Sequence, residues 1–92
     1  MPLAYLSQEK KAELVKRFAP REGDTGSPEA QVALLTHRIR HLTDHLKTHK
    51  KDVSTRLGLL RMVGRRRRLL RYLAGRSLSR YRDLLSALDI RA

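Results

Sequence analysis

Apolar residues recur every three or four positions through most of this 92-residue chain. After Pro28 they stand at Val32, Leu35, Ile39, Leu42 and Leu46. This spacing puts them on one side of an α-helix, whereas a half-buried strand would alternate apolar and polar residues. No stretch alternates convincingly with a period of two. The sequence therefore predicts an all-α fold.

Four segments show this helical spacing. They cover residues 7–18, 28 to about 49–51, 52 or 54 to 74, and 77–88. The second has the clearest start, because Ser27 can cap the first turn and Pro28, at the first helical position, gives up no hydrogen bond. Gly75 is expected to stop the third helix, since glycine commonly follows a helix C-terminus.

The short connections between long helices predict antiparallel neighbours, so the last three helices should form one up-and-down bundle. The other positions expected to be buried are Leu59, Leu60, Val63, Leu70 and Leu73 in the third helix and Leu78, Tyr81, Leu85 and Leu88 in the fourth. The N-terminal helix has the weakest apolar stripe and the longest connection, and is expected to dock more loosely. Residues 1–92 are expected to form a single domain.

Positive charge is the strongest compositional feature. The chain has 21 Lys and Arg against 9 Asp and Glu, a formal net charge of +12. Residues 56–92 hold eleven of these bases, all Arg, and only two of the acids. Arg presents a planar fork of donors that grips phosphate oxygens. A chain with this bias is expected to bind RNA phosphates, through Arg66, Arg67 and Arg68 on a face outside the apolar seam.

The absence of Cys and of any long apolar run limits the other possibilities. Without Cys there is no disulfide, thiolate metal site or Cys nucleophile, and no cofactor is expected. No stretch has the ~20 apolar residues of a bilayer span, and no secretory signal is evident, so a cytoplasmic protein without membrane contact is expected. A lipid-binding protein would need exposed apolar faces, and the bundle is expected to use these faces itself.

All four histidines follow one another four residues apart, at His37, His41, His45 and His49. Pairs at this spacing can bind a metal ion on a helix. A closed site needs further ligands, and none is evident. The stripe lies nearly opposite the apolar seam, so we expect an outward polar or RNA-facing edge and no metal. The tripeptide at 24–26 copies that of aspartic proteases, but as a single copy in a helical chain. An enzyme is not expected.

The expected arrangement of helices favours RNA over DNA. A helix-turn-helix reader uses short helices near right angles, and three tyrosines are too few for the stacking sheet of a single-strand binder. We expect a folded, largely double-stranded RNA as the target. A basic nucleoid-type DNA-binding protein is the alternative.

Four stretches are specific enough to indicate a family. They are GDTGSPEAQVALLT (23–36), HLKTHKKD (45–52), GLLRMVG (58–64) and RRRLLRYL (66–73). In this order they resemble the bacterial small-subunit ribosomal protein S-fifteen family over nearly the whole chain. The resemblance implies a four-helix protein that binds the central domain of small-subunit ribosomal RNA and aids its assembly. It also implies contacts with neighbouring small-subunit proteins and with large-subunit RNA across the subunit interface.

The resemblance further implies which residues bind RNA. In this family one surface holds a three-way helical junction, and another reads the minor groove of a nearby duplex. The junction contacts fall on Thr25, Gly26, Gln31, Arg38, Arg68 and Tyr72. The minor-groove contacts fall on His45, Asp52 and Thr55.

The sequence departs from the family pattern directly after Asp52. VSTRL (53–57) stands where the resemblance leads us to expect two His, a Ser and two basic residues. Either Ser54 or Thr55 could supply the hydroxyl of the minor-groove site. Asp52 itself is a carboxylate that phosphates would repel. It could accept a hydrogen bond from the guanine amine in the shallow minor groove of RNA, or it could only cap the third helix.

Overall fold

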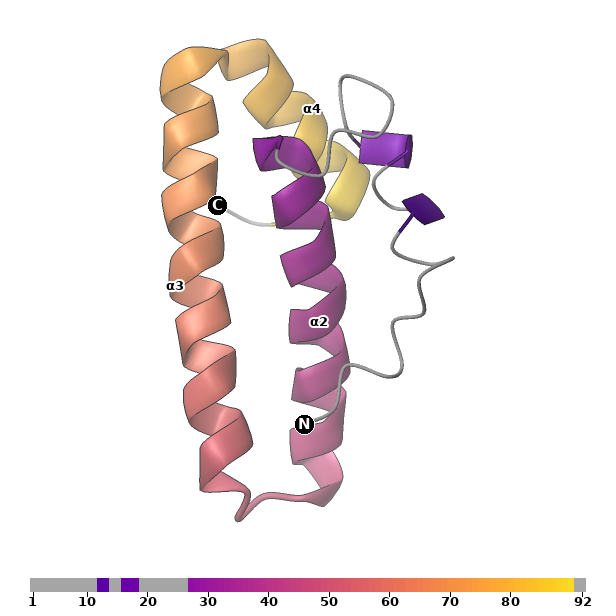
Figure 1. Ribbon diagram of the computed structural model, residues 1–92, viewed down its shortest axis with the longest axis vertical. Coiled ribbons are helices and arrows are strands. Elements are labelled where there is room, and N and C mark those ends of the chain that lie inside the picture. Colours follow the sequence, from indigo (N-terminus) through magenta and orange to yellow (C-terminus); the bar gives the residue numbers. More distant parts are fainter. Residues whose placement is uncertain (1–11, 14–15, 19–26, 91–92) are drawn as a thin grey trace.

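The computed structural model describes residues 12–13, 16–18 and 27–90, and these are almost entirely helical. Figure 1 shows two long antiparallel helices and a shorter third helix that folds back over one end of the pair. The three are α2 (Pro28–Thr48), α3 (Val53–Arg76) and α4 (Leu78–Leu88). The described part of the chain contains no strand. The predicted all-α fold, with the last three helices packed as an antiparallel bundle, is confirmed.

α2 begins where the sequence predicts and ends at Thr48, just before the predicted end near residues 49–51. The Ser27 hydroxyl oxygen accepts a hydrogen bond from the Ala30 N–H at 3.2 Å, and Pro28 lies in the first turn. At the other end the His49 N–H donates to the His45 carbonyl at 3.0 Å. Each of these bonds satisfies one backbone group at a helix end, the first through a side-chain cap.

α3 starts where Asp52 caps it, because the Oδ1 atom of this residue accepts a hydrogen bond from the Thr55 N–H at 3.0 Å. The predicted stop at Gly75 is wrong. Gly75 lies inside the helix and does not adopt the left-handed conformation of a glycine stop. α3 continues to Arg76 and ends at Ser77, whose backbone is extended (φ −158°, ψ 108°).

Ser77 joins α3 to α4 without a loop. Its N–H donates to the Leu73 carbonyl at 2.8 Å, which closes α3. Its hydroxyl oxygen accepts from the Arg80 N–H at 3.3 Å, which caps α4. One serine thus serves both helices, so the chain reverses here without the glycine that the sequence analysis expected.

The core lies at the end of the α2–α3 hairpin that α4 covers. Its buried residues are Val32, Ala33, Leu70, Leu73, Leu84 and Leu88. Two positions predicted to be buried are exposed: Leu60 at 62% and Leu78 at 50%. Leu60 lies in the half of α3 nearer the hairpin turn, which α4 does not reach (Figure 1). Each helix there buries only the stripe that faces the other. Leu84, which was not predicted, is 4% exposed.

An ion pair between Glu29 and Arg80 ties the start of α2 to the start of α4. The Nε and Nη2 atoms of Arg80 each donate to a carboxylate oxygen of Glu29 at 2.7 Å. Glu29 is buried, with 8% of its surface exposed. A bidentate pair of this kind fixes orientation as well as distance. It holds α4 in place over the core.

The first predicted helix lies mostly outside the described residues. Residues 12–13 and 16–18 are helical, as expected. Phe18 is half-buried and packs against the core. This side chain anchors the segment on α2 and α4, while the docking of the rest of the helix lies outside what the structure describes.

Candidate nucleic-acid interface

The turn between α2 and α3 gathers three of the predicted site residues. Asp52 accepts hydrogen bonds from the Thr55 hydroxyl at 2.6 Å and from the Thr55 N–H at 3.0 Å. His45 Nε2 lies 3.0 Å from Asp52 Oδ2. Ser54 is exposed and takes no part in these three contacts. We call His45, Asp52 and Thr55 the corner cluster, and Thr55 supplies its hydroxyl.

The corner cluster keeps Asp52 charged. The two hydrogen bonds from Thr55, followed by the bond from His45, hold the pKa of Asp52 well below its usual value of 3.8. Because Asp52 is a carboxylate, His45 must carry its proton on Nε2 in order to donate to it. In the neutral ring Nδ1 is then an acceptor. The cluster therefore presents acceptor atoms although the surrounding protein is strongly basic.

His49 supports the corner cluster from the last turn of α2. Its ring stacks on that of His45, with centroids 4.2 Å apart and planes 5° from parallel. Its Nδ1 lies 3.2 Å from the His45 carbonyl oxygen and 2.9 Å from the Thr48 hydroxyl. The four-residue spacing of these histidines was interpreted as a possible metal pair or a polar edge. The same spacing was the available signal for this stack.

The prediction that all four histidines form one outward edge is wrong. His49 is exposed, whereas the other three are half-buried. His37 and His41 line a pocket on the α4 side of α2, while His45 belongs to the corner cluster. Four residues advance about 40° around a helix, so the stripe drifts from one side of α2 to the other. Within the described ranges no group of three or more His, Asp or Glu side chains could hold a metal ion.

Among the described helices, α4 covers one side of α2 and none covers the other side. Thr36 and Arg40 line a pocket together with the last turn of α4. Two residues along an α-helix correspond to a rotation of about 200°. Arg38 therefore lies nearly opposite both Thr36 and Arg40, on the uncovered side. Gln31 and His45, seven residues before and after Arg38, lie on that same side.

The same reasoning applies to α3. Arg67 and Leu70 line a pocket together with Tyr81 of α4. Tyr72 is two residues beyond Leu70, and Arg65 is two residues before Arg67, so both lie away from α4. We call the uncovered side of the hairpin the open face; it consists of Gln31, Arg38, His45, Arg65, Arg68 and Tyr72. The corner cluster adjoins it through His45, while Thr55 is buried beneath.

The arginine run does not stay outside the apolar seam, contrary to the prediction. Arg66 points toward α2 and is half-buried, and its Nη1 donates to the Thr36 hydroxyl at 3.3 Å. Burial, and then the charges of Arg40 and Arg67, lower the pKa of Arg66. Arg67 lies on the α4 side, and Arg68 is exposed at the edge of the open face. Consecutive residues turn about 100° around a helix, so four in a row must surround it.

The open face carries donors and one exposed ring. Tyr72 is 53% exposed, and the Arg76 guanidinium lies 5.7 Å from its ring centre. The Nε atom of Arg38 is buried and has no acceptor among the described residues. The sequence contains no acid between Asp52 and Asp83. Thr25 and Gly26, also predicted to bind RNA, lie outside the described residues.

Comparison with known proteins identifies the family. The family model for ribosomal protein S15 matches residues 10–91. The chain belongs to this family. It is 60% identical over 86 residues to the small ribosomal subunit protein uS15 of Sulfurovum sp. (strain NBC37-1), and 52% identical over 86 residues to the protein of the same name from Lactococcus lactis subsp. cremoris (strain MG1363). Both matches cover 94% of this chain and 97% of the relative.

Membership in the ribosomal protein S15 family confirms several predictions. The chain is a structural ribosomal protein and not an enzyme, and its place in the cell is the cytoplasmic ribosome. The resemblance found in the four sequence stretches is confirmed. The alternative of a nucleoid-type DNA-binding protein receives no support from these matches. None of the helices in the described part of the chain is long and apolar enough to cross a membrane.

Proposed function

We propose that this protein binds a three-way helical junction and an adjacent duplex minor groove of small-subunit ribosomal RNA, and that this binding aids assembly of the central domain. The observation that carries the proposal is the open face. α2 has 21 residues, which corresponds to about 30 Å of helix. A face of this length can contact two separate places on a folded RNA. We propose neighbouring small-subunit proteins and large-subunit RNA as further partners, on the strength of the family alone.

The end of the open face near the core suits the junction. Arg68 is exposed and can bind phosphate bidentately, while the exposed ring of Tyr72 can stack on a base or ribose where strands part. Gln31 lies near the start of α2 and can reach a base edge or a ribose hydroxyl. Thr25 and Gly26 directly precede this end in the chain, which supports a role for them in the same contact.

The corner cluster, at the other end, suits the minor groove. The minor groove of A-form RNA is shallow and presents 2′-hydroxyls and the guanine amine. A carboxylate has about four acceptor positions, and the contacts of Asp52 with Thr55 and His45 use three of them. One position on Asp52, with Nδ1 of His45, remains for donors from the RNA. Asp52 can therefore cap α3 and accept a hydrogen bond from the RNA at the same time.

Chemical footprinting of the full chain on small-subunit ribosomal RNA tests the proposal. We expect protection at one three-way junction and in one nearby duplex, which duplex DNA in excess does not remove. Arg68→Gln should weaken the junction protection at least fivefold. The matched variant Arg82→Gln, which removes the same charge from an exposed position on α4, should not. Protection spread evenly over the RNA, or lost to duplex DNA, would refute junction binding.

A further inference from the structure

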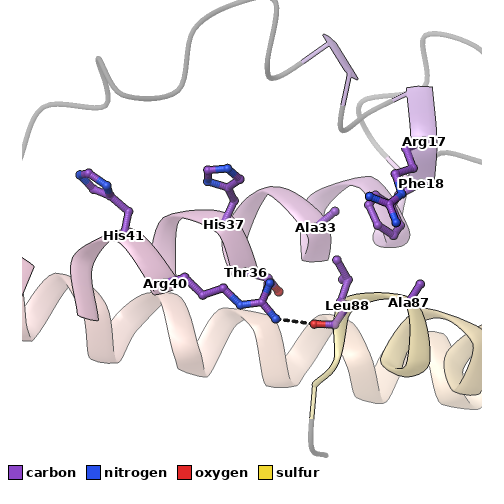
Figure 2. Close-up of a pocket in the computed structure, with 9 residues that line it drawn as sticks. All are labelled: Arg17, Phe18, Ala33, Thr36, His37, Arg40, His41, Ala87 and Leu88. Carbon is purple, nitrogen blue, oxygen red and sulfur yellow. Dashed lines mark hydrogen bonds between the residues drawn. The ribbon is translucent and has the colours of Figure 1, made fainter. Parts of the chain in front are cut away.

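A second cationic site lies on the side of α2 opposite the open face. A pocket of about 400 Å³ opens between residues 16–18, α2 and the end of α4 (Figure 2). Four of its described side chains are basic: Arg17, His37, Arg40 and His41. None of the described side chains that line it is a carboxylate. Its volume falls within the range of about 300–1,000 Å³ that is typical of small-ligand sites.

A further cationic side chain, that of Arg66, lies next to this pocket. Arg66 donates to the hydroxyl of Thr36, which lines the pocket. Burial is the main cause that lowers the pKa of Arg66, and the charges of Arg40 and Arg67 lower it further. Arg66 is half-buried and Arg40 is exposed, and like charges near each other repel. An anion in the pocket would relieve this repulsion.

Arg40 is held in a position from which it can bind such an anion. Its Nη2 donates to the Leu88 carbonyl at the end of α4, which leaves most of the five N–H donors of a guanidinium. Figure 2 shows Arg40 extended along α2 to Leu88, with the rings of His37 and His41 projecting from the same stretch of helix. A guanidinium fixed at one end presents its remaining fork in a defined direction, which favours phosphate.

We propose that this pocket binds a phosphate group, with Arg40 and Arg17 as its charged contacts and Ala87 on its wall. The phosphate can belong to an RNA strand that reaches the far side of α2, or to a free phosphate ester. The chemistry of recognition is the same for both. The site does not depend on the open face, and its test does not require that the junction proposal hold.

Titration of the free full chain with inorganic phosphate, followed by NMR at constant pH and ionic strength, tests the site. The Arg40 Nε–H signal and the ring signals of His37 and His41 should shift and saturate. Arg40→Gln should weaken the response at least tenfold. Ala87→Met keeps every charge and fills the pocket from an exposed wall position, so it should weaken the response equally even if Arg40→Gln unfolds the end of α4. Arg82→Gln, outside the pocket, should respond like the natural chain.

Shifts that grow linearly without saturation, or that persist unchanged in Ala87→Met, would overturn the site. The source of the phosphate follows from repeating the titration with junction RNA already bound. Loss of the response, together with weaker RNA binding by Ala87→Met, assigns the pocket to an RNA phosphate. A response to adenosine monophosphate that RNA does not remove assigns it to a free phosphate ester. If junction RNA does not bind at all, the proposed function fails, while the phosphate titration still decides the pocket.

Discussion

Asp52 shows how one side chain serves the fold and the proposed interface together. Its Oδ1 caps α3 through the Thr55 N–H, and its Oδ2 holds the Thr55 hydroxyl and the His45 ring. Removing the carboxylate therefore removes the cap of α3 and the hydrogen-bond partner of both the Thr55 hydroxyl and the His45 ring. The effects on stability and on RNA binding must be measured on the same variant, because either one alone has two explanations.

Asp52→Ala is expected to lower affinity for the cognate RNA at least about fivefold, the lower end of what one base-edge contact contributes. Replacing the guanine by inosine removes the amine, so the variant and the natural chain should then bind alike. Filter binding with both RNAs measures this, and the melting temperature reports the lost cap. Asp44→Asn, at an exposed position on α2, is the control. An equal loss on both RNAs would contradict guanine reading.

The lowered pKa of Asp52 makes the stability of the α2–α3 corner depend on acid pH. The carboxylate is stabilised by Thr55 and His45 only in the folded chain. Its contribution is therefore complete above the unfolded-state pKa of about 4 and is lost as the pH falls through the lower folded-state pKa. The difference in melting temperature between the natural chain and Asp52→Asn should be constant above about pH 5 and should narrow below pH 4. A difference that widens in acid would contradict this assignment.

Arg66 and Arg68 form a matched pair that separates folding from binding. Arg66 bonds to Thr36 between the helices, whereas Arg68 is exposed at the edge of the open face. Arg66→Ala should lower the free energy of unfolding by about 1 kcal/mol. Arg68→Ala should leave stability nearly unchanged and reduce the log–log salt slope of RNA binding by about 0.9, the value for one phosphate contact. Urea unfolding measures the stability of both variants, and salt titrations measure their RNA binding. Equal losses of stability and equal changes of salt slope in the two variants would contradict the positions assigned to Arg66 and Arg68.

At the scale of the elements, the junction between α3 and α4 depends on Ser77 and not on Gly75. Ser77 adopts an extended backbone and caps α4 with its hydroxyl. Gly75 is helical, and a Cβ atom added there would meet nothing within 4 Å. The two residues are close in sequence, but only one of them ends a helix.

Gly75→Ala is accordingly expected to raise the free energy of unfolding by about 0.5–1 kcal/mol, because alanine is the better helix former. A glycine in the left-handed conformation would give the opposite sign, since a Cβ there is strained. Urea unfolding measures the change. Ser77→Ala, which removes the cap of α4, should cost about 1 kcal/mol in the same assay. Destabilisation by Gly75→Ala would instead support the helix end that the sequence predicted at Gly75.

At the scale of the whole molecule, the formal net charge of +12 opposes folding and favours binding to a polyanion. Arg residues surround α3 and crowd the pocket beside α2. Only a few acids balance them, and Glu29 is already paired with Arg80. Salt screens like charges within the free chain and also competes with the protein for phosphates.

Added potassium chloride should therefore raise the melting temperature of the free chain while it weakens RNA binding. We expect the log of the association constant to fall against log salt with a slope of magnitude about 3 or more, which corresponds to several neutralised phosphates. Thermal melts and binding titrations over the same salt series measure both. A slope near zero, or a melting temperature that falls with salt, would contradict the electrostatic account.

The sequence by itself determined the helices and the family. The spacing of Val32, Leu35, Ile39 and Leu42 implied a helix with one buried side, and Ser27 with Pro28 marked its start. Such features are local, because a cap or a stripe depends on residues within a few turns of each other. The four motif stretches were long enough to identify the family for the same reason: they could be read directly along the chain.

The tertiary structure alone decided which sides of the helices are covered. α4 packs on one side of one end of the hairpin, so Leu84 is buried and Leu60 is exposed, although both stand at plausible core positions. The packing of α3 against α2 placed Arg66 in the seam between these two helices and joined His45 to Asp52 across the turn. These contacts join residues from different helices. Their partners depend on where a neighbouring helix packs, and periodicity within one helix cannot specify that.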